Sequence, residues 1–286
     1  MRALFRLFGI LVLGFAAVPS QAQTIFSASG PDPASVQPTV DAFRAGLGTL
    51  NPNVAGSLGI GRREINWDGV PDALSAPNNL PADFFNVNSP RGVVFSTPGT
   101  GFQVSSTAAS GTPVEFGNID PTYTQTFETF SAQRLFTALG SNIVDVNFFI
   151  PGSTTQAFTN GFGAVFTDVD VADATTLSFF GLGGAFLGTW SVPNVVGANE
   201  TLSFLGVLFS DPVVTRVRIT SGTAALAPGG IDLAADRVAM DDFIFGEPRL
   251  AAAAVPEPGS WAMLLVGFAA LGSTFRRRRT IAQRAC

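Results

Sequence analysis

The sequence predicts an all-β protein, an antiparallel β-sandwich, on the strength of three observations. In the segment 213–220, Val217 and Ile219 alternate with Arg216 and Arg218, which is the period-2 pattern of a strand with one buried face. Other apolar, Phe-rich segments have the length of strands, and turn residues such as Pro-Gly, Asp-Pro and Pro-Asn separate them. Turns at a spacing of about 8–12 residues are typical of sandwiches and barrels rather than of βαβ units.

The first element is a secretory signal. Arg2 and Arg6 precede an apolar region from Leu7 to Val18, and Pro19 ends it. Small residues up to Ala22 form a site that signal peptidase recognises. We therefore expect residues 1–22 to be a signal peptide for export through Sec, with cleavage after Ala22.

A short N-terminal segment, residues 23–62, follows the signal and contains one predicted helix. From Thr39 to Leu50, the residues Val40, Phe43, Leu47 and Leu50 recur at helical spacing and form one apolar face.

The predicted β-sandwich domain covers residues 63–250. It opens with the strand Arg63–Gly69 and closes with the segment 237–245. Between them we expect strands at 92–96, 101–105, 142–150, 162–171, 175–180, 185–192, 201–209 and 213–220. No internal repeat and no second domain is apparent.

The chain ends with three ordered elements. Pro256 and Pro258 have fixed φ angles and no backbone N–H, so the Pro-Glu-Pro segment is an extended hinge. An uncharged run of about 15 residues follows, from Trp261 to Phe275, and would extend ~22 Å as a helix. This is short against a bilayer core of about 30 Å. The arginines Arg276, Arg277, Arg278 and Arg279 then supply the positive charge that stays on the cytoplasmic side.

This order of elements resembles the PEP-CTERM sorting signal of Gram-negative bacteria, in its Pro-Glu-Pro-x-x-Trp-Ala form. The matching residues are Val255, Pro256, Glu257, Pro258, Trp261, Ala262 and Met263, followed by the apolar run and the arginines. The resemblance implies that residues 255–280 hold the protein in the inner membrane by a single helix until an exosortase, a membrane protease, processes it. It further implies a final location at the cell surface or outside the cell, in species that make extracellular polysaccharide.

Charge and composition exclude several classes of function. Of the 16 basic residues seven lie in the targeting ends, and of the 21 acidic residues only Glu257 does, which leaves a mature net charge of about −11. Such an acidic domain is repelled by nucleic acid, so nucleic-acid binding is excluded. The only cysteine, Cys286, lies beyond the tail, and the mature domain therefore contains no disulfide.

The first and last predicted strands carry an acidic pattern. Asp68 follows Trp67 in the first strand, and Asp241 and Asp242 precede Phe243 in the last. This pattern resembles jelly-roll domains of exported PEP-CTERM proteins and jelly-roll carbohydrate-binding modules. In those modules the two strands pair and an acidic residue from each helps to hold a structural calcium ion. The resemblance implicates Asp68 and Asp241, with Asp242 as the alternative ligand.

The chemistry of the Asp-Asp pair leaves two interpretations open. Adjacent residues of a strand point to opposite faces, so Asp241 shares a face with Phe243, and Asp242 shares one with Met240 and Ile244. Both faces are apolar, and a buried carboxylate needs a cation or several hydrogen bonds. Either the aspartates bind Ca²⁺, which accepts many oxygen ligands, or they accept hydrogen bonds from backbone N–H groups at turns.

A second acidic group contains Asp168 and Asp170, which we expect on one face of a strand. It lacks the glycine and the distal glutamate of an EF-hand loop. The two aspartates are either solvated surface residues or a second, weaker calcium site.

Most enzyme classes are excluded because the chain has no His and no Lys, and the mature part has no Cys. Catalytic triads, histidine-ligated zinc and Schiff bases are therefore impossible. A carboxylate-based glycoside hydrolase is the remote alternative. A carbohydrate-binding module is the nearer one, with Trp190 and Tyr123 as possible sugar platforms if they are exposed. Our leading prediction is an exported, non-enzymatic protein of the cell surface or extracellular matrix, associated with polysaccharide or biofilm.

Overall fold

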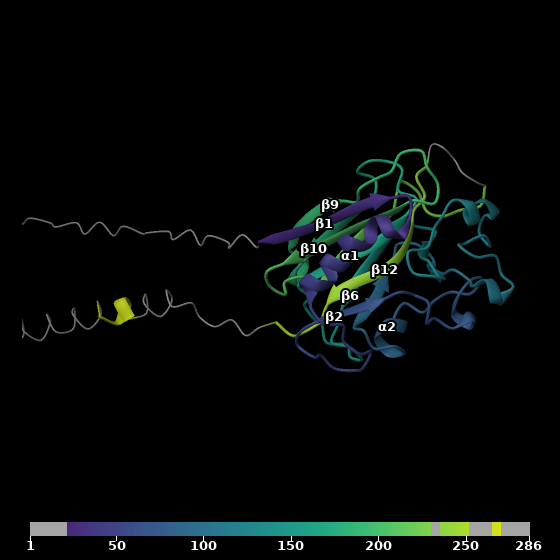
Figure 1. Cartoon of the computed structure of the whole chain (residues 1–286). Coiled ribbons are helices and arrows are strands. Elements are labelled where there is room, and N and C mark those ends of the chain that lie inside the picture. Colours follow the sequence, from purple (N-terminus) through teal and green to yellow (C-terminus); the bar gives the residue numbers. More distant parts are fainter. Residues whose placement is uncertain (1–21, 230–234, 252–264, 270–286) are drawn as a thin grey trace, which may run out of the picture. The chain divides into compact units, whose positions relative to one another are not determined.

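Two antiparallel sheets stack on each other, as the alternating patterns predict (Figure 1). The computed structural model describes residues 22–229, 235–251 and 265–269. The sandwich belongs to a unit that ends at Leu250, whereas the second unit begins at Ala251. Every pair of named strands is antiparallel, which is consistent with a jelly-roll-like sandwich.

The larger sheet has seven strands and contains both ends of the domain. Its order is β1 (Gln23–Gly30), β10 (Leu202–Phe209), β7 (Gly161–Thr167), β12 (Ala239–Gly246), β5 (Phe136–Leu139) and β4 (Gly101–Val104), and β2 (Arg62–Ile65) also pairs with β12. The smaller sheet has the order β3 (Val93–Ser96), β6 (Ile143–Phe148), β11 (Arg216–Thr220), β8 (Thr176–Phe180) and β9 (Phe186–Ser191). Two strands, β1 and β5, have no counterpart among the predicted segments. The sheet thus starts at Gln23, before the predicted domain start at Arg63.

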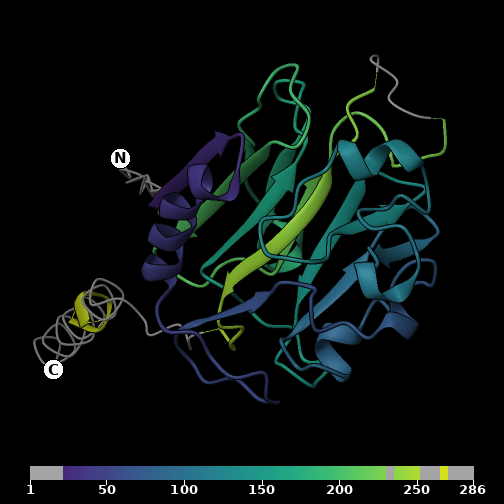
Figure 2. The ribbon, with the colours of Figure 1, turned by 45° about the vertical axis from the view of Figure 1, so that its right-hand side comes forward.

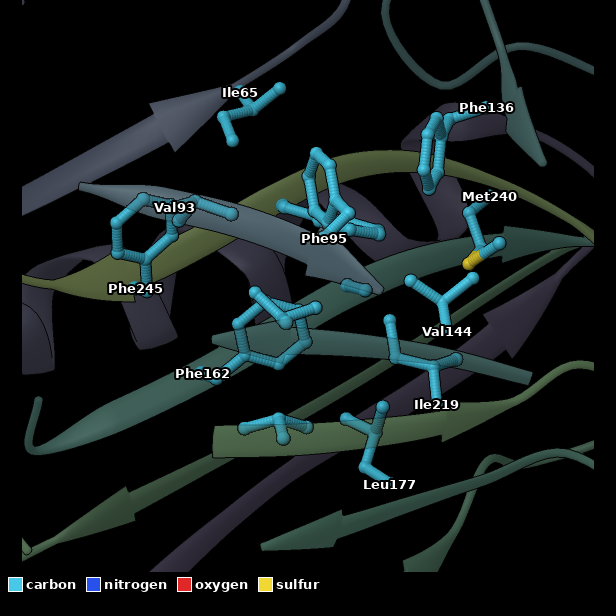
Figure 3. Packing of buried hydrophobic residues seen from close by; sticks show 14 of the residues in the cluster. Ile65, Val93, Phe95, Phe136, Val144, Phe162, Leu177, Ile219, Met240 and Phe245 are labelled. Carbon is cyan, nitrogen blue, oxygen red and sulfur yellow. The ribbon is translucent and has the colours of Figure 1, made fainter. Parts of the chain in front are cut away.

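The core between the sheets is rich in phenylalanine (Figure 3). Trp67 is 1% exposed and stacks on Phe136, with 4.1 Å between the ring centroids. Phe243 meets the same indole edge-on at 5.0 Å. Aromatic side chains bury large apolar areas, so this cluster accounts for much of the stability of the domain.

Helix α1 (Pro33–Leu47) covers the outer face of β1 and β10 and is the purple helix in Figure 2. Asp32 caps its first turn, because its Oδ1 accepts a hydrogen bond from the Ser35 N–H at 2.9 Å. The ring of Phe43 lies over Gly163 and Gly206, where any Cβ would come within 3 Å of ring atoms. The glycines of two paired strands therefore form the notch into which the helix docks.

The helix differs from its prediction at both ends. It begins at Pro33 instead of Thr39, because Asp32 caps the helix and proline suits its first position. Pro38 is accommodated within the helix. It ends at Leu47, since Gly48 follows with φ of 99°. Leu50 is 51% exposed and does not extend the buried face.

Strand β12 contains a β-bulge, which interrupts the alternation of side chains between the two faces of the strand. Its register against β7 shifts between Met240 and Phe243. As a result Met240 packs in the same core as Phe243, and not on the opposite face as the alternation predicts. The bulge falls on Asp241 and Asp242, and such bulges re-aim the side chains that they contain.

Candidate functional site

The loop formed by residues 128–134 lies against the acidic residues of β12. Asp241 is fully buried, and its Oδ2 accepts hydrogen bonds from the N–H groups of Phe130 at 2.6 Å and Ser131 at 3.2 Å. Asp68 Oδ1 accepts from the N–H groups of Gln133 at 2.6 Å and Arg134 at 3.2 Å. Both aspartates thus bind backbone N–H groups, as the second of the two interpretations expects.

The predicted pairing of the first and last strands is present. Ile65 of β2 lies opposite Phe243 of β12, and the indole N–H of Trp67 donates to the Asp241 carbonyl at 2.9 Å. Asp68 and Asp241 nevertheless bind different parts of the loop. A calcium ion held jointly by their carboxylates remains a prediction.

Asp242 turns toward helix α1. Its Oδ2 accepts from Arg44 Nη2 at 3.1 Å, and its Oδ1 accepts from the Ser131 hydroxyl at 2.7 Å. The same guanidinium binds Glu64 of β2 through Nε at 3.0 Å and Nη2 at 2.9 Å. One arginine therefore ties the helix to two strands of the larger sheet.

These charges line an open groove of about 380 Å³ between α1, β2 and the loop 128–134. The volume lies within the range of small-ligand sites. The groove presents equal numbers of cationic and anionic side chains, several amides and two apolar side chains: Arg44, Arg91, Glu64, Asp242, Gln37, Asn51, Asn53, Asn66, Leu50 and Phe130. Asn53 and Asn66 lie at its exposed edge.

Burial dominates the acid–base properties of the Asp-Asp pair. It raises the pKa of Asp242 to about 6, although the Ser131 hydroxyl and the Arg44 charge favour the ionised form. Burial and the neighbouring Asp242 raise the pKa of Asp241 well above its ordinary value. The pair therefore holds protons more tightly than free aspartates do.

The second acidic group departs from its prediction. Strand β7 ends at Thr167, and Asp168 follows with φ of 65°, so the two aspartates do not share a strand face. Asp168 is 7% exposed and is therefore not a solvated surface residue. Burial, and then the charges of Asp170 and Asp236, raise its pKa to about 8. Asp236, which the sequence patterns did not single out, joins this cluster from the segment before β12.

Of the two predicted sugar platforms, Tyr123 is buried, whereas Trp190 keeps part of its surface exposed. Tyr123 is 1% exposed and its hydroxyl donates to the Ala227 carbonyl at 2.9 Å, so the prediction for Tyr123 is wrong. Trp190 is partly buried and meets Phe179 edge-on at 5.3 Å, so one side of the indole packs against the core and its role as a sugar platform stays a prediction. Apolar strand residues pack against one another first, and the sequence pattern does not reveal which aromatic ring remains free.

Sequence reasoning missed the groove because its parts lie far apart in the chain. Arg44, Arg91 and Ser131 come from a helix and two loops, and no motif connects them. The only local signal was the Asp241-Asp242 pair, whose partners depend on tertiary structure.

Most of the predicted targeting residues lie outside the described residues. This holds for the signal peptide up to Gln21 and for Pro256, Glu257, Pro258, Trp261, Arg276, Arg277, Arg278 and Arg279. Ala22 is described and its carbonyl accepts from the Ser210 N–H at 3.0 Å. Residues 265–269 are helical. Across the described ranges we find no helix with the length and apolarity needed to cross a membrane.

Within the same ranges, no three carboxylate, imidazole or thiolate side chains are grouped so that they could hold a metal ion together.

Comparison with protein families matches residues 254–279 to the PEP-CTERM protein-sorting motif. Comparison with curated proteins and with solved structures gave no match. The match covers the tail alone, and it confirms the resemblance inferred from the Pro-Glu-Pro hinge, the apolar run and the arginines.

Proposed function

We propose that this chain, which carries the PEP-CTERM sorting motif, is a non-enzymatic protein of the cell surface or extracellular matrix. The motif at residues 254–279 carries the proposal, because it implies export, transient membrane anchoring and processing by an exosortase-type protease. The acidic, disulfide-free sandwich is then the part displayed outside the cell, in association with extracellular polysaccharide or biofilm. Signal peptidase acts first, after Ala22.

A test of sorting removes the tail. Truncation before Val255 should release the protein in soluble form from the periplasmic side of its native host, whereas the full chain fractionates with the membrane and then the surface. Substitution of Pro256 and Pro258 by alanine should block processing and leave the uncut form in the membrane. Identical fractionation of the truncated and full-length forms would refute sorting by the tail.

Carbohydrate binding in the groove is the second candidate function. Sugar hydroxyls both donate and accept hydrogen bonds, and the groove offers amides, a balanced set of charges and the ring of Phe130. Balanced charge favours a neutral saccharide over a polyanion, which the net negative charge of the domain would repel.

The groove supports binding better than hydrolysis. Glycoside hydrolases place two carboxyl groups on either side of the scissile bond. Here Glu64 and Asp242 are bound to the same guanidinium, and Asp242 is only 2% exposed. A sugar in the groove would therefore meet Arg44 before it met the carboxylate of Asp242.

A glycan array with the exported protein, followed by calorimetry, tests this candidate. The double variant Asn53→Ala/Asn66→Ala removes two amides from the groove edge and should weaken binding of any captured glycan at least tenfold. Asn78→Ala, another exposed asparagine outside the groove, is the matched control and should bind like the wild type. Equal binding by both variants would remove the groove as the site, and hydrolysis of the captured glycan would favour the glycosidase alternative.

A further inference from the structure

Buried oxygen atoms without hydrogen-bond partners gather where β7 ends and β10 begins. Within the described residues, six buried side-chain polar atoms lack a partner, and four of them belong to this region: Asp168 Oδ1, Asp170 Oδ1, Thr201 Oγ1 and Ser203 Oγ. Thr201 comes directly before β10, and Asp168 comes directly after Thr167, which pairs with Leu202 at the end of the β7–β10 register. Such atoms are costly to bury unless something binds them.

The backbone holds Asp168 in one position. Its N–H donates to the Thr201 carbonyl at 3.0 Å, which closes the ladder between β7 and β10. Its φ of 65° lies in the left-handed region, which aspartate tolerates better than most residues. Asp168 is therefore held in place and is 93% buried, and its Oδ1 has no hydrogen-bond partner.

The next residues are fixed from two other segments. Asp236 accepts hydrogen bonds from the N–H groups of Asp170 at 3.2 Å and Val171 at 3.4 Å. Asn194 Nδ2 donates to the Asp170 carbonyl at 3.1 Å. These bonds hold the turn after β7 in place and leave Asp170 Oδ1 without a partner. Three carboxylates thus share this region, and none of the ion pairs among the described residues involves them.

We propose that Asp168 and Asp170 bind a calcium ion, that the Thr201 hydroxyl is a third oxygen ligand, and that Asp236 is a positioning residue for the turn. All four unpartnered atoms of this region are oxygens, the ligands of hard cations, and none is the nitrogen or sulfur ligand that zinc usually takes. Ca²⁺ completes its six to eight ligands with backbone carbonyls and water, so two carboxylates are sufficient. Mg²⁺ requires near-octahedral geometry and fits an irregular strand end less well.

The experiment uses the exported protein freed of metal with EDTA and then titrated with CaCl₂ or MgCl₂ at neutral pH. Calorimetry should detect calcium binding, and saturating calcium should raise the Tm of the wild type by several degrees because it binds only the folded state. Magnesium should produce a smaller shift. Asp168→Asn and Asp170→Asn should each weaken calcium binding more than tenfold and abolish the Tm response.

Three further measurements keep the outcome clear. In EDTA, Asp168→Asn should melt no lower than the wild type, because it relieves repulsion among three acids, and this shows that it folds. Asp211→Asn changes an exposed aspartate and should keep the full calcium response. Absence of calcium binding by the wild type would overturn the proposal. So would a response that survives in Asp168→Asn but disappears in Asp68→Asn, which would locate calcium at the strand pair β2–β12 instead.

Discussion

The two ends of strand β12 stabilise buried charge in opposite ways. The strand is eight residues long, so its end residues lie about 24 Å apart at ~3.4 Å per residue. Just past its last residue, Glu247 binds Arg63 through two hydrogen bonds of 2.7 and 2.9 Å, and both side chains are at most 1% exposed. Three residues before its first residue, Asp236 accepts hydrogen bonds from the backbone N–H groups of Asp170 and Val171 and lies near the charge of Asp170.

Every nitrogen of the Arg63 guanidinium has an acceptor. Besides Glu247, it donates to backbone carbonyls of the loop 52–56 and of Pro90, at distances of 2.7 to 3.1 Å. The arginine therefore satisfies a buried carboxylate and orders a loop at the same time. At the other end, Asp168, Asp170 and Asp236 take part in none of the ion pairs that the described residues form with one another. The proposed calcium ion, or a proton held by Asp168, would reduce the repulsion between the carboxylates there.

The largest expected effect is at the paired end. Arg63→Ala should lower the free energy of unfolding by about 3–5 kcal/mol, because it leaves Glu247 buried without a counter-charge. Urea denaturation of the sandwich domain measures this loss. Arg218→Ala is the control, since Arg218 pairs with Asp145 with 41% of its side chain exposed, and should cost at most ~1 kcal/mol. Similar losses for both variants would contradict the distinction between buried and exposed pairs.

In the middle of β12, the buried carboxylate of Asp241 is stabilised by backbone N–H groups and not by a counter-charge. Asp241→Ala should lower the free energy of unfolding by about 2–4 kcal/mol, because the Phe130 and Ser131 N–H groups lose their acceptor. Asp241→Asn keeps an oxygen acceptor and removes a buried charge, so it should cost clearly less. Asp68→Ala should cost about 1 kcal/mol, as the loop it binds is more exposed. An equal cost for Asp241→Asn and Asp241→Ala would show that the charge, and not the acceptor, matters at this position.

The sequence predicted the strands well because they repeat a local pattern. Val217 and Ile219 alternate with arginines, and β11 lies where that alternation places it. Strand β1 was missed, since Gln23–Gly30 follows the signal peptide directly and its exposed residues give little alternation. The pairing of β2 with β12 followed from the jelly-roll resemblance. The bulge at Asp241 did not, because a bulge depends on the partner strand.

The chemistry of the site was less predictable than the fold. The sequence singled out Asp241 and Asp242 as acids that need partners, and left Asp168 as either a solvated surface residue or a ligand of a weaker calcium site. Their partners are set by tertiary contacts: Ser131 lies 110 residues before Asp241, and Arg44 lies 198 residues before Asp242. The tail is the exception, since a sorting signal acts as a linear sequence and can be read without a fold.

The last expected effect tests the acidic end of β12 through the pH dependence of stability. Glu115 lies with Glu128 and Glu200, and the Glu128 N–H donates to Thr167 at the end of β7. Burial, and then the charges of the two glutamates, raise the pKa of Glu115 from 4.5 to about 7. The folded protein thus binds this proton more tightly than the unfolded chain does. The resulting stability is fully present below pH 4.5 and is lost as the pH rises toward 7. Because the side chain is partly exposed, we expect a loss of only about 1–2 kcal/mol.

Urea denaturation in EDTA at several pH values measures how the free energy of unfolding depends on pH. Glu115→Gln should remove the part of this dependence that lies between pH 4.5 and 7. If the variant kept the wild-type slope between pH 4.5 and 7, Glu115 would not be a source of the pH dependence, and the acidic end would differ from the Arg63 end through Asp168 and its neighbours alone.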